Sequence, residues 1–208
     1  MDAANEKQWH DFWRRLGAGG DPSRLWQRLA AAYSESWRRY HNLKHIGHCL
    51  DEFATAAHLA RYPLTVEAAI WFHDFVYDTY RRDNEERSAE VAETELGAAG
   101  MKPDFLDSVR RLILATKHAS PPAPNDAALL TDIDLSILGQ APEAYAEFER
   151  QIRDEYSWAS DSDFSIGRST ILKSFLARPD IFTTKSFRQK YEAQARLNLE
   201  WAIKRMAG

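Results

Sequence analysis

The chain has 208 residues, of which 44% are hydrophobic and 28% charged, a balance typical of one globular domain. The net charge of −4 disfavours a nucleic-acid partner, which usually meets a basic surface. The single cysteine, Cys49, excludes an internal disulfide and a cysteine-based zinc cage. No apolar run approaches the ~20 residues of a membrane span, and the polar N-terminus does not fit a signal peptide. We therefore expect a cytoplasmic protein without a membrane partner.

Asp21 followed by Pro22 predicts a helix start, because aspartate caps free N–H groups and proline fits the first helical position. The helix that follows is expected over Leu25 to Trp37. Apolar residues at helical spacing predict a second helix from Leu43 to Ala60.

Tyr62-Pro63 breaks the second helix, and a third is expected to begin near Thr65. This third helix carries His73-Asp74 within the apolar run Ala-Ala-Ile-Trp-Phe-His-Asp-Phe-Val-Tyr. Two strongly polar side chains inside a buried helix cost free energy unless something pairs with them, and a divalent cation is one such partner.

Asp83 or Asn84 can cap a fourth helix over residues 85–96. A fifth, over 103–118, ends where the proline-rich segment 120–124 cannot continue it. The remaining helices are expected at residues 129–138, 142–156, 166–176 and 186–206. Because no strand alternation is evident, the fold class is predicted as all-α. We expect a single-domain helical bundle over 1–208, with a core of about 25–140 and C-terminal helices 141–208 packing onto it.

His41 and His45 lie four positions apart, which places both on one face of a helix. They could share a metal or form an ordinary histidine pair at a helix start. A zinc-protease motif would need glutamate directly after the first histidine, and Asn42 occupies that position.

His73 and Asp74 point about 100° apart if both are helical, so they could share a cation only at the edge between them. The alternative is a buried hydrogen bond between this pair and a neighbouring helix. Asp132 and Asp134, in Leu-Leu-Thr-Asp-Ile-Asp-Leu, diverge by about 200° on a helix, so one would face the site while Asp132 could serve as an N-cap.

These polar groups occur in the order His, His-Asp, Asp along the chain. With its motifs in this order, the sequence resembles the HD-domain superfamily of metal-dependent phosphohydrolases, and more narrowly a bacterial family of predicted HD phosphohydrolases. The matching segments are Tyr40–Ile46, Trp71–Tyr77, Asp83–Ala89 and Asp132–Gly139. The resemblance covers most of residues 33–200 and implies an HD-type helical bundle.

The resemblance implies four metal ligands: His45, His73, Asp74 and Asp134. His41 and Asp132 remain alternatives for the first and last of them. A histidine after the next helix often serves the substrate or a second metal in the superfamily, and His118 looks similar to it. The donors suit Mn²⁺, Fe²⁺, Co²⁺, Ni²⁺ or Zn²⁺ better than Mg²⁺, and one or two ions could bind.

The expected reaction is hydrolysis of a small phosphate ester, such as a nucleotide, by metal-activated water. Asp74, Glu85 and His118 are the catalytic candidates. The candidates for contacts with the phosphorylated substrate are His41, Asn42, Arg81, Asn84 and Lys117, although Arg81 could equally belong to a solvated charged face.

Three other interpretations remain open at this point. The superfamily also contains di-iron oxygenases, and a second metal at His41 and His118 would suit that chemistry. The metal site could instead serve a helical binding module without catalysis, or the polar groups could be ordinary packing contacts. Aromatic-rich outer helices could also support a homodimer.

Overall fold

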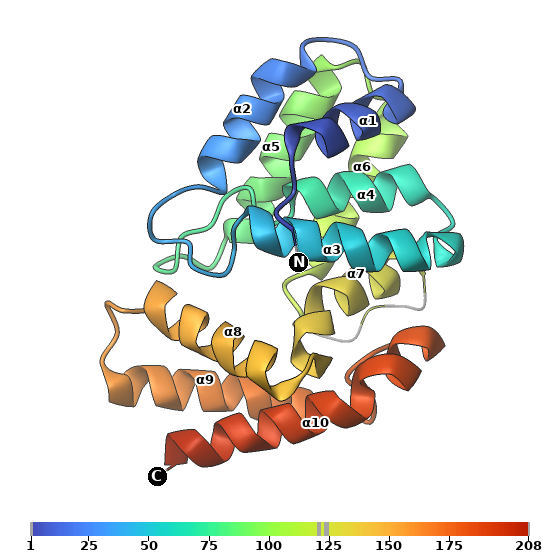
Figure 1. Ribbon diagram of the computed structural model, residues 1–208. Coiled ribbons are helices and arrows are strands. Elements are labelled where there is room, and N and C mark those ends of the chain that lie inside the picture. The colour runs from blue at the N-terminus through green and yellow to red at the C-terminus, as the bar shows by residue number, and fades with distance from the viewer. Residues whose placement is uncertain (1, 120–121, 123–124, 208) are drawn as a thin grey trace. The chain divides into compact units, whose positions relative to one another are not determined.

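The computed structural model describes residues 2–119, 122 and 125–207, and this part of the chain is helical without any strand (Figure 1). The all-α prediction is therefore confirmed. The helices are α1 (Glu6–Leu16), α2 (Pro22–Ala32), α3 (Leu43–Ala56), α4 (Pro63–Phe72), α5 (Asn84–Ala98), α6 (Pro103–Ala115), α7 (Asp126–Asp134), α8 (Pro142–Glu155), α9 (Asp161–Leu176) and α10 (Lys185–Ala207), with short 3-10 helices at Ala57–Leu59 and Leu135–Gly139. None of the described helices combines the length and apolar character needed to cross a bilayer.

The chain divides into two compact units, an N-terminal unit of Met1–Thr131 and a C-terminal unit of Asp132–Gly208. The division falls within α7, earlier than the position near residue 140 at which the core was expected to end. That a single domain spans 1–208 stays a prediction. The expected break at 120–124 lies largely outside the described residues.

Helix α1 was not predicted, although its signals are local. Asn5 accepts a hydrogen bond from the Gln8 N–H, and the Gln8 side chain accepts one from the Asn5 N–H, which is a reciprocal cap. Trp9, Phe12 and Trp13 follow at helical spacing and are buried. The Trp9 ring meets Trp71 of α4 edge-on at 5.4 Å, so α1 packs against α4.

Helix α2 begins as predicted, with the Asp21 carboxylate accepting from the N–H groups of Ser23 and Arg24. It ends at Ala32, so the predicted extension to Trp37 is wrong. Tyr33 instead turns inward, and its hydroxyl donates to the Trp71 carbonyl at 3.0 Å. Tertiary bonding of this kind overrides local helix propensity.

Helix α4 is the centre of the N-terminal unit. Every residue from Thr65 to Phe72 is buried, as expected for a helix that is apolar on all sides. It contacts α1, α3, α5 and α6, and α5 and α6 lie side by side (Figure 1). The end of α4 is therefore held in place from several directions.

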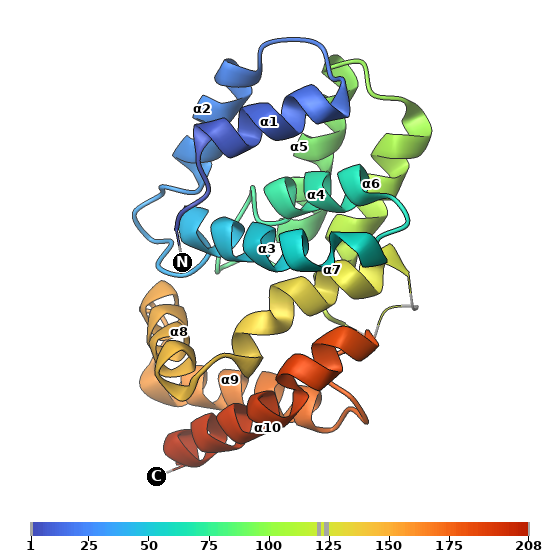
Figure 2. The same cartoon turned by 45° about the vertical axis from the view of Figure 1, so that its right-hand side comes forward.

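In the C-terminal unit, α10 packs along α8, α9 and the 3-10 helix at Leu135–Gly139 (Figure 2). A side chain at Gly139 would collide with Tyr191, so glycine permits this close approach. Asn198, on α10, donates to the carbonyls of Leu138 and Gln140, both at 2.8 Å. Helix α9 begins at Asp161, five residues before the predicted start, because Ser160 caps it.

Candidate metal centre

The structure places the His-Asp doublet at the C-terminal end of α4 rather than inside it. His73 is the C-cap residue, and Asp74 follows the helix. The 100° separation expected of two helical neighbours therefore does not apply, since the chain leaves the helix between them. His45 comes from α3, which packs beside α4.

Three ligand atoms of the N-terminal unit converge here. Nε2 of His45 lies 3.1 Å from Nε2 of His73 and 3.4 Å from Oδ2 of Asp74. Nε2 of His73 lies 3.1 Å from the same carboxylate oxygen. Two donor atoms that each lie ~2.1 Å from one cation and subtend about 90–109° at it are about 3.0–3.4 Å apart. The cluster therefore has the dimensions of a metal site, and these residues could hold an ion.

The hydrogen bonds of His73 determine which ring nitrogen faces the cluster. Nδ1 lies 3.0 Å from the Ile70 carbonyl oxygen, which can only accept, so Nδ1 carries the proton. In the neutral ring Nε2 then presents a lone pair toward His45 and Asp74. Lone pairs and a carboxylate that face one another require either extra protons or a cation between them.

The cluster is also shielded from water. His45 and His73 are buried, and the Asp74 side chain is 17% exposed. Burial alone would raise the pKa of Asp74, but its electrostatic interactions with His73 and His41 and its hydrogen bonds with the imidazoles of His45 and His73 outweigh it. They hold the pKa well below its usual value, so Asp74 stays anionic.

Two further side chains contact His45. The Tyr40 hydroxyl lies 3.1 Å from its Nδ1, and the Cys49 sulfur lies 3.8 Å from both ring nitrogens. Cys49 is buried one helical turn after His45. In the sequence, Cys49 was considered only to exclude an internal disulfide and a cysteine-based zinc cage, although its spacing of four residues from His45 could have indicated this contact.

His41 lies beside the cluster but outside the group of three ligand atoms. Its ring stacks on Tyr77 at 4.1 Å with an interplanar angle of 26°, and its centroid is 5.8 Å from that of His45. The geometry thus favours His45 over His41 as the ligand, with His41 at the wall of the site. The assignment itself stays a prediction.

Asn84 and Ser88, on one face of α5, hold the segment that follows the doublet. Asn84 accepts from the Asp78 N–H at 3.1 Å and donates to the Asp78 carbonyl at 2.9 Å. Ser88 accepts from the Val76 N–H at 3.0 Å and donates to its carbonyl at 3.3 Å. The Asn84 amide thus binds backbone, and its predicted contact with substrate stays a prediction.

The other predicted polar contacts are also engaged within the protein. Asn42 is the N-cap of α3 and bonds the Lys44 N–H. Arg81 forms a bidentate pair with Asp83, both contacts at 2.7 Å. Lys117 lies 2.5 Å from the Glu86 carboxylate. A phosphate would have to compete with these acidic partners for Arg81 and Lys117.

Glu85 is close enough to Lys117 and Asp74 for both charges to affect its pKa. Burial raises its pKa, and the charge of Asp74 adds to the shift, while Lys117 opposes it. Lys117 approaches the Glu85 carboxylate to 4.0 Å. A carboxylic acid with a raised pKa is suited to proton transfer. His118 follows Lys117 with a backbone φ of +52°, beyond the end of α6.

Asp132 and Asp134 belong to the C-terminal unit. Asp132 is not the N-cap that was considered, because α7 begins at Asp126. Its carboxylate oxygens accept from the N–H groups of Thr183 and Thr184, at 2.8 and 2.7 Å. This structural role leaves Asp134 as the better candidate ligand, and that choice stays a prediction.

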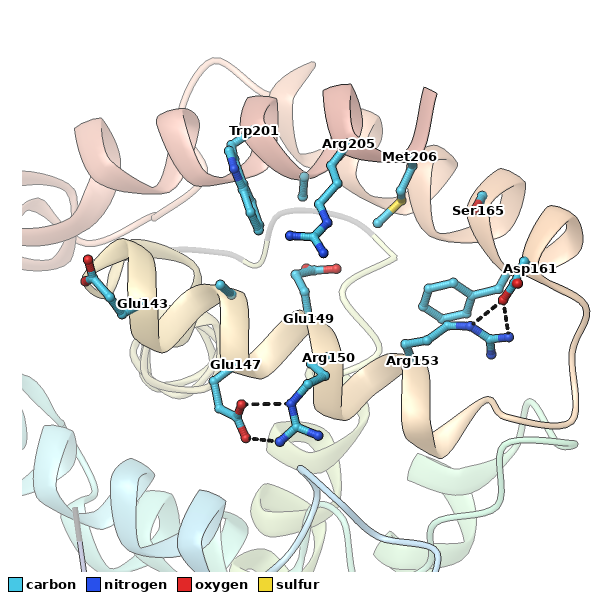
Figure 3. A pocket seen from close by; sticks show the side chains of 13 residues that line it. Glu143, Glu147, Glu149, Arg150, Arg153, Asp161, Ser165, Trp201, Arg205 and Met206 are labelled. Atoms are coloured by element: carbon cyan, nitrogen blue, oxygen red, sulfur yellow. Dashed lines mark hydrogen bonds and ion pairs between the residues drawn. The ribbon is translucent and has the colours of Figure 1, made fainter. Parts of the chain in front are cut away.

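The C-terminal unit also contains a pocket of about 750 Å³ between α8, α9 and α10 (Figure 3). Its charged side chains form ion pairs, Arg150 with Glu147 at 2.5 Å and Arg153 with Asp161 at 2.7 Å. No histidine or cysteine lines it. The pocket is roomy, but Arg150 and Arg153 are already paired with carboxylates of its own lining.

Comparison with models of protein families, with curated proteins and with solved structures finds no match to this chain. Membership of the HD superfamily therefore rests on the four sequence motifs and stays a prediction.

Proposed function

We propose that this chain is a metal-dependent phosphohydrolase that acts on a small phosphate ester, such as a nucleotide. The observation that supports the proposal is the convergence of His45, on α3, with His73 and Asp74, at the end of α4, at spacings suited to one divalent cation. A cation held there would lower the pKa of water toward ~7 and offset charge on a phosphoryl group.

The protein's own side chains prepare this chemistry. The Ile70 carbonyl fixes the tautomer of His73, and the Tyr40 hydroxyl oxygen can accept a hydrogen bond from Nδ1–H of His45, which leaves both Nε2 atoms to face the cluster. Glu85 keeps its proton to a higher pH than an ordinary glutamate and can deliver it to a leaving oxygen.

The test is a panel of phosphate esters assayed with Mn²⁺, Co²⁺, Ni²⁺, Zn²⁺ and Mg²⁺, on protein purified without an affinity tag. We expect turnover with one or more transition metals, more weakly with Mg²⁺, and none after chelation. Metal binding without turnover across the panel would contradict the proposal and favour a non-catalytic module. Two irons per chain with oxygen-dependent turnover would favour an oxygenase.

A further inference from the structure

Arg38 is the most deeply buried charged side chain beside the cluster, and no sequence motif points to it. Its side chain is 1% exposed. A guanidinium buried to this degree cannot reach a substrate directly. Its role must therefore lie in what it holds.

Four of the five N–H groups of Arg38 are used. Nε donates to Glu35 at 2.9 Å, and Nη1 donates to the carbonyls of His41 at 3.3 Å and Asp74 at 2.5 Å. Nη2 donates to the Phe75 carbonyl at 2.9 Å. The guanidinium of Arg38 thus links the segment before α3, at His41, to the segment after α4, at Asp74 and Phe75.

Two aromatic rings complete the enclosure of Arg38. The guanidinium carbon lies 5.3 Å from the centroid of Tyr33 and 5.6 Å from that of Tyr77, distances typical of cation–π contacts. Tyr77 in turn stacks on His41. Arg38 therefore contacts both members of the wall formed by His41 and Tyr77.

We infer that Arg38 is a positioning residue that holds the two sides of the metal centre together and keeps Asp74 at ligand distance from the histidines. From α5, Asn84 and Ser88 bind the backbone of Asp78 and Val76, so the segment 74–78 is held from two sides. The inference rests on the proposed function, because it concerns the same metal centre.

Lysine cannot replace this arrangement. Its ammonium is a compact charge without the planar fork, and it cannot reach three separate carbonyls in these directions. We expect Arg38→Lys to keep the fold while it loosens the segment 74–78 and shifts the Asp74 carboxylate. Changes in groups that orient metal ligands typically weaken metal binding about 10- to 100-fold.

The first experiment measures Co²⁺ binding by its visible absorption, at a temperature at which circular dichroism shows each variant folded. We expect Arg38→Lys to raise the Co²⁺ dissociation constant about tenfold or more and to alter the spectrum. The matched control is Arg15→Lys. Arg15 makes a bidentate pair with Glu67 on the same helix, α4, and its replacement should cost stability but leave the Co²⁺ constant unchanged.

A second measurement needs no metal. The amides of Phe75, Val76 and Asp78 are hydrogen bonded and should exchange with deuterium slowly in the wild type. In Arg38→Lys we expect their exchange to rise about tenfold, without a comparable rise in Arg15→Lys. Unchanged exchange and an unchanged Co²⁺ constant would overturn the inference.

If Arg38→Lys does not fold, Glu35→Gln serves instead, because it removes the carboxylate partner of Arg38 at a half-exposed position. It should weaken Co²⁺ binding in the same direction by a smaller factor, and no weakening would overturn the inference. Wild-type protein that binds no Co²⁺ would refute the metal centre and the proposed function. Binding that is equal in the wild type and Arg38→Lys would refute the role of Arg38 alone.

Discussion

The cluster at the end of α4 and the pocket of the C-terminal unit each contain a largely enclosed carboxylate, but the two carboxylates differ in their partners. In the lining of the pocket, Glu149 receives two hydrogen bonds from Arg168, at 3.1 and 2.6 Å. At the cluster, Asp74 meets two imidazole nitrogens, of which one presents a lone pair when its ring is neutral. Side chains that satisfy one another stabilise the fold, whereas donors that need a further partner indicate a binding site.

The largest expected effect is at the cluster itself. His73→Ala and Asp74→Ala should each abolish metal retention, because each removes one of three converging donors. Metal analysis of the purified proteins checks this. Normal metal content in both variants would refute the ligand assignment and remove the distinction between the two regions.

Arg168→Met should produce the complementary result in the C-terminal unit. It leaves the Glu149 carboxylate buried without its partner, which typically costs about 3–5 kcal/mol. Urea unfolding should show this loss, while the metal content stays that of the wild type. A loss of metal in this variant would show that the two regions are not separate in function.

The two aspartates of α7 are expected to have different roles, Asp132 in stability and Asp134 in metal binding. Asp132→Asn removes one of the acceptors for Thr183 and Thr184 and should cost about 1–3 kcal/mol of unfolding free energy, with metal binding retained. Asp134→Asn should reduce phosphatase activity more than Asp132→Asn does. The reverse order of activities would exchange their roles.

Tyr40→Phe should weaken metal binding about tenfold, because it removes the hydroxyl that orients His45. Tyr191→Phe in the C-terminal unit is the control. It removes a hydroxyl that accepts from Gln140 at 3.2 Å and should leave metal binding unchanged. Equal affinities of Tyr40→Phe and the wild type, measured by chelator competition, would show that His45 needs no support from Tyr40.

The smallest effect concerns Glu85. Its pKa is raised above the ordinary value of 4.5, so the folded protein binds more protons than the unfolded chain in the pH range just above 4.5. Stability then falls as the pH rises through that range. Glu85→Gln should remove this dependence, so its unfolding free energy relative to the wild type should increase as the pH rises above 4.5. A constant difference would show that the shift is absent.

Local sequence patterns determined most of the helices of this protein. The Asp21-Pro22 start of α2 and the continuous apolar character of α4 both follow from interactions within a few residues. The same is true of α1, whose reciprocal cap between Asn5 and Gln8 was present in the sequence but was not recognised. The sequence also indicated which residue types form the cluster, because burying histidine and aspartate within an apolar run costs free energy unless they have a partner.

The tertiary structure alone decided where α4 ends and how the cluster is assembled. The carbonyls of Asp74 and Phe75 bind the guanidinium of Arg38, and Val76 binds Ser88, so the chain leaves the helix at His73. These partners lie 12 to 37 residues away in the sequence, where no helical periodicity connects them. His45 and His73 are 28 residues apart, and only the packing of α3 against α4 brings their nitrogens together.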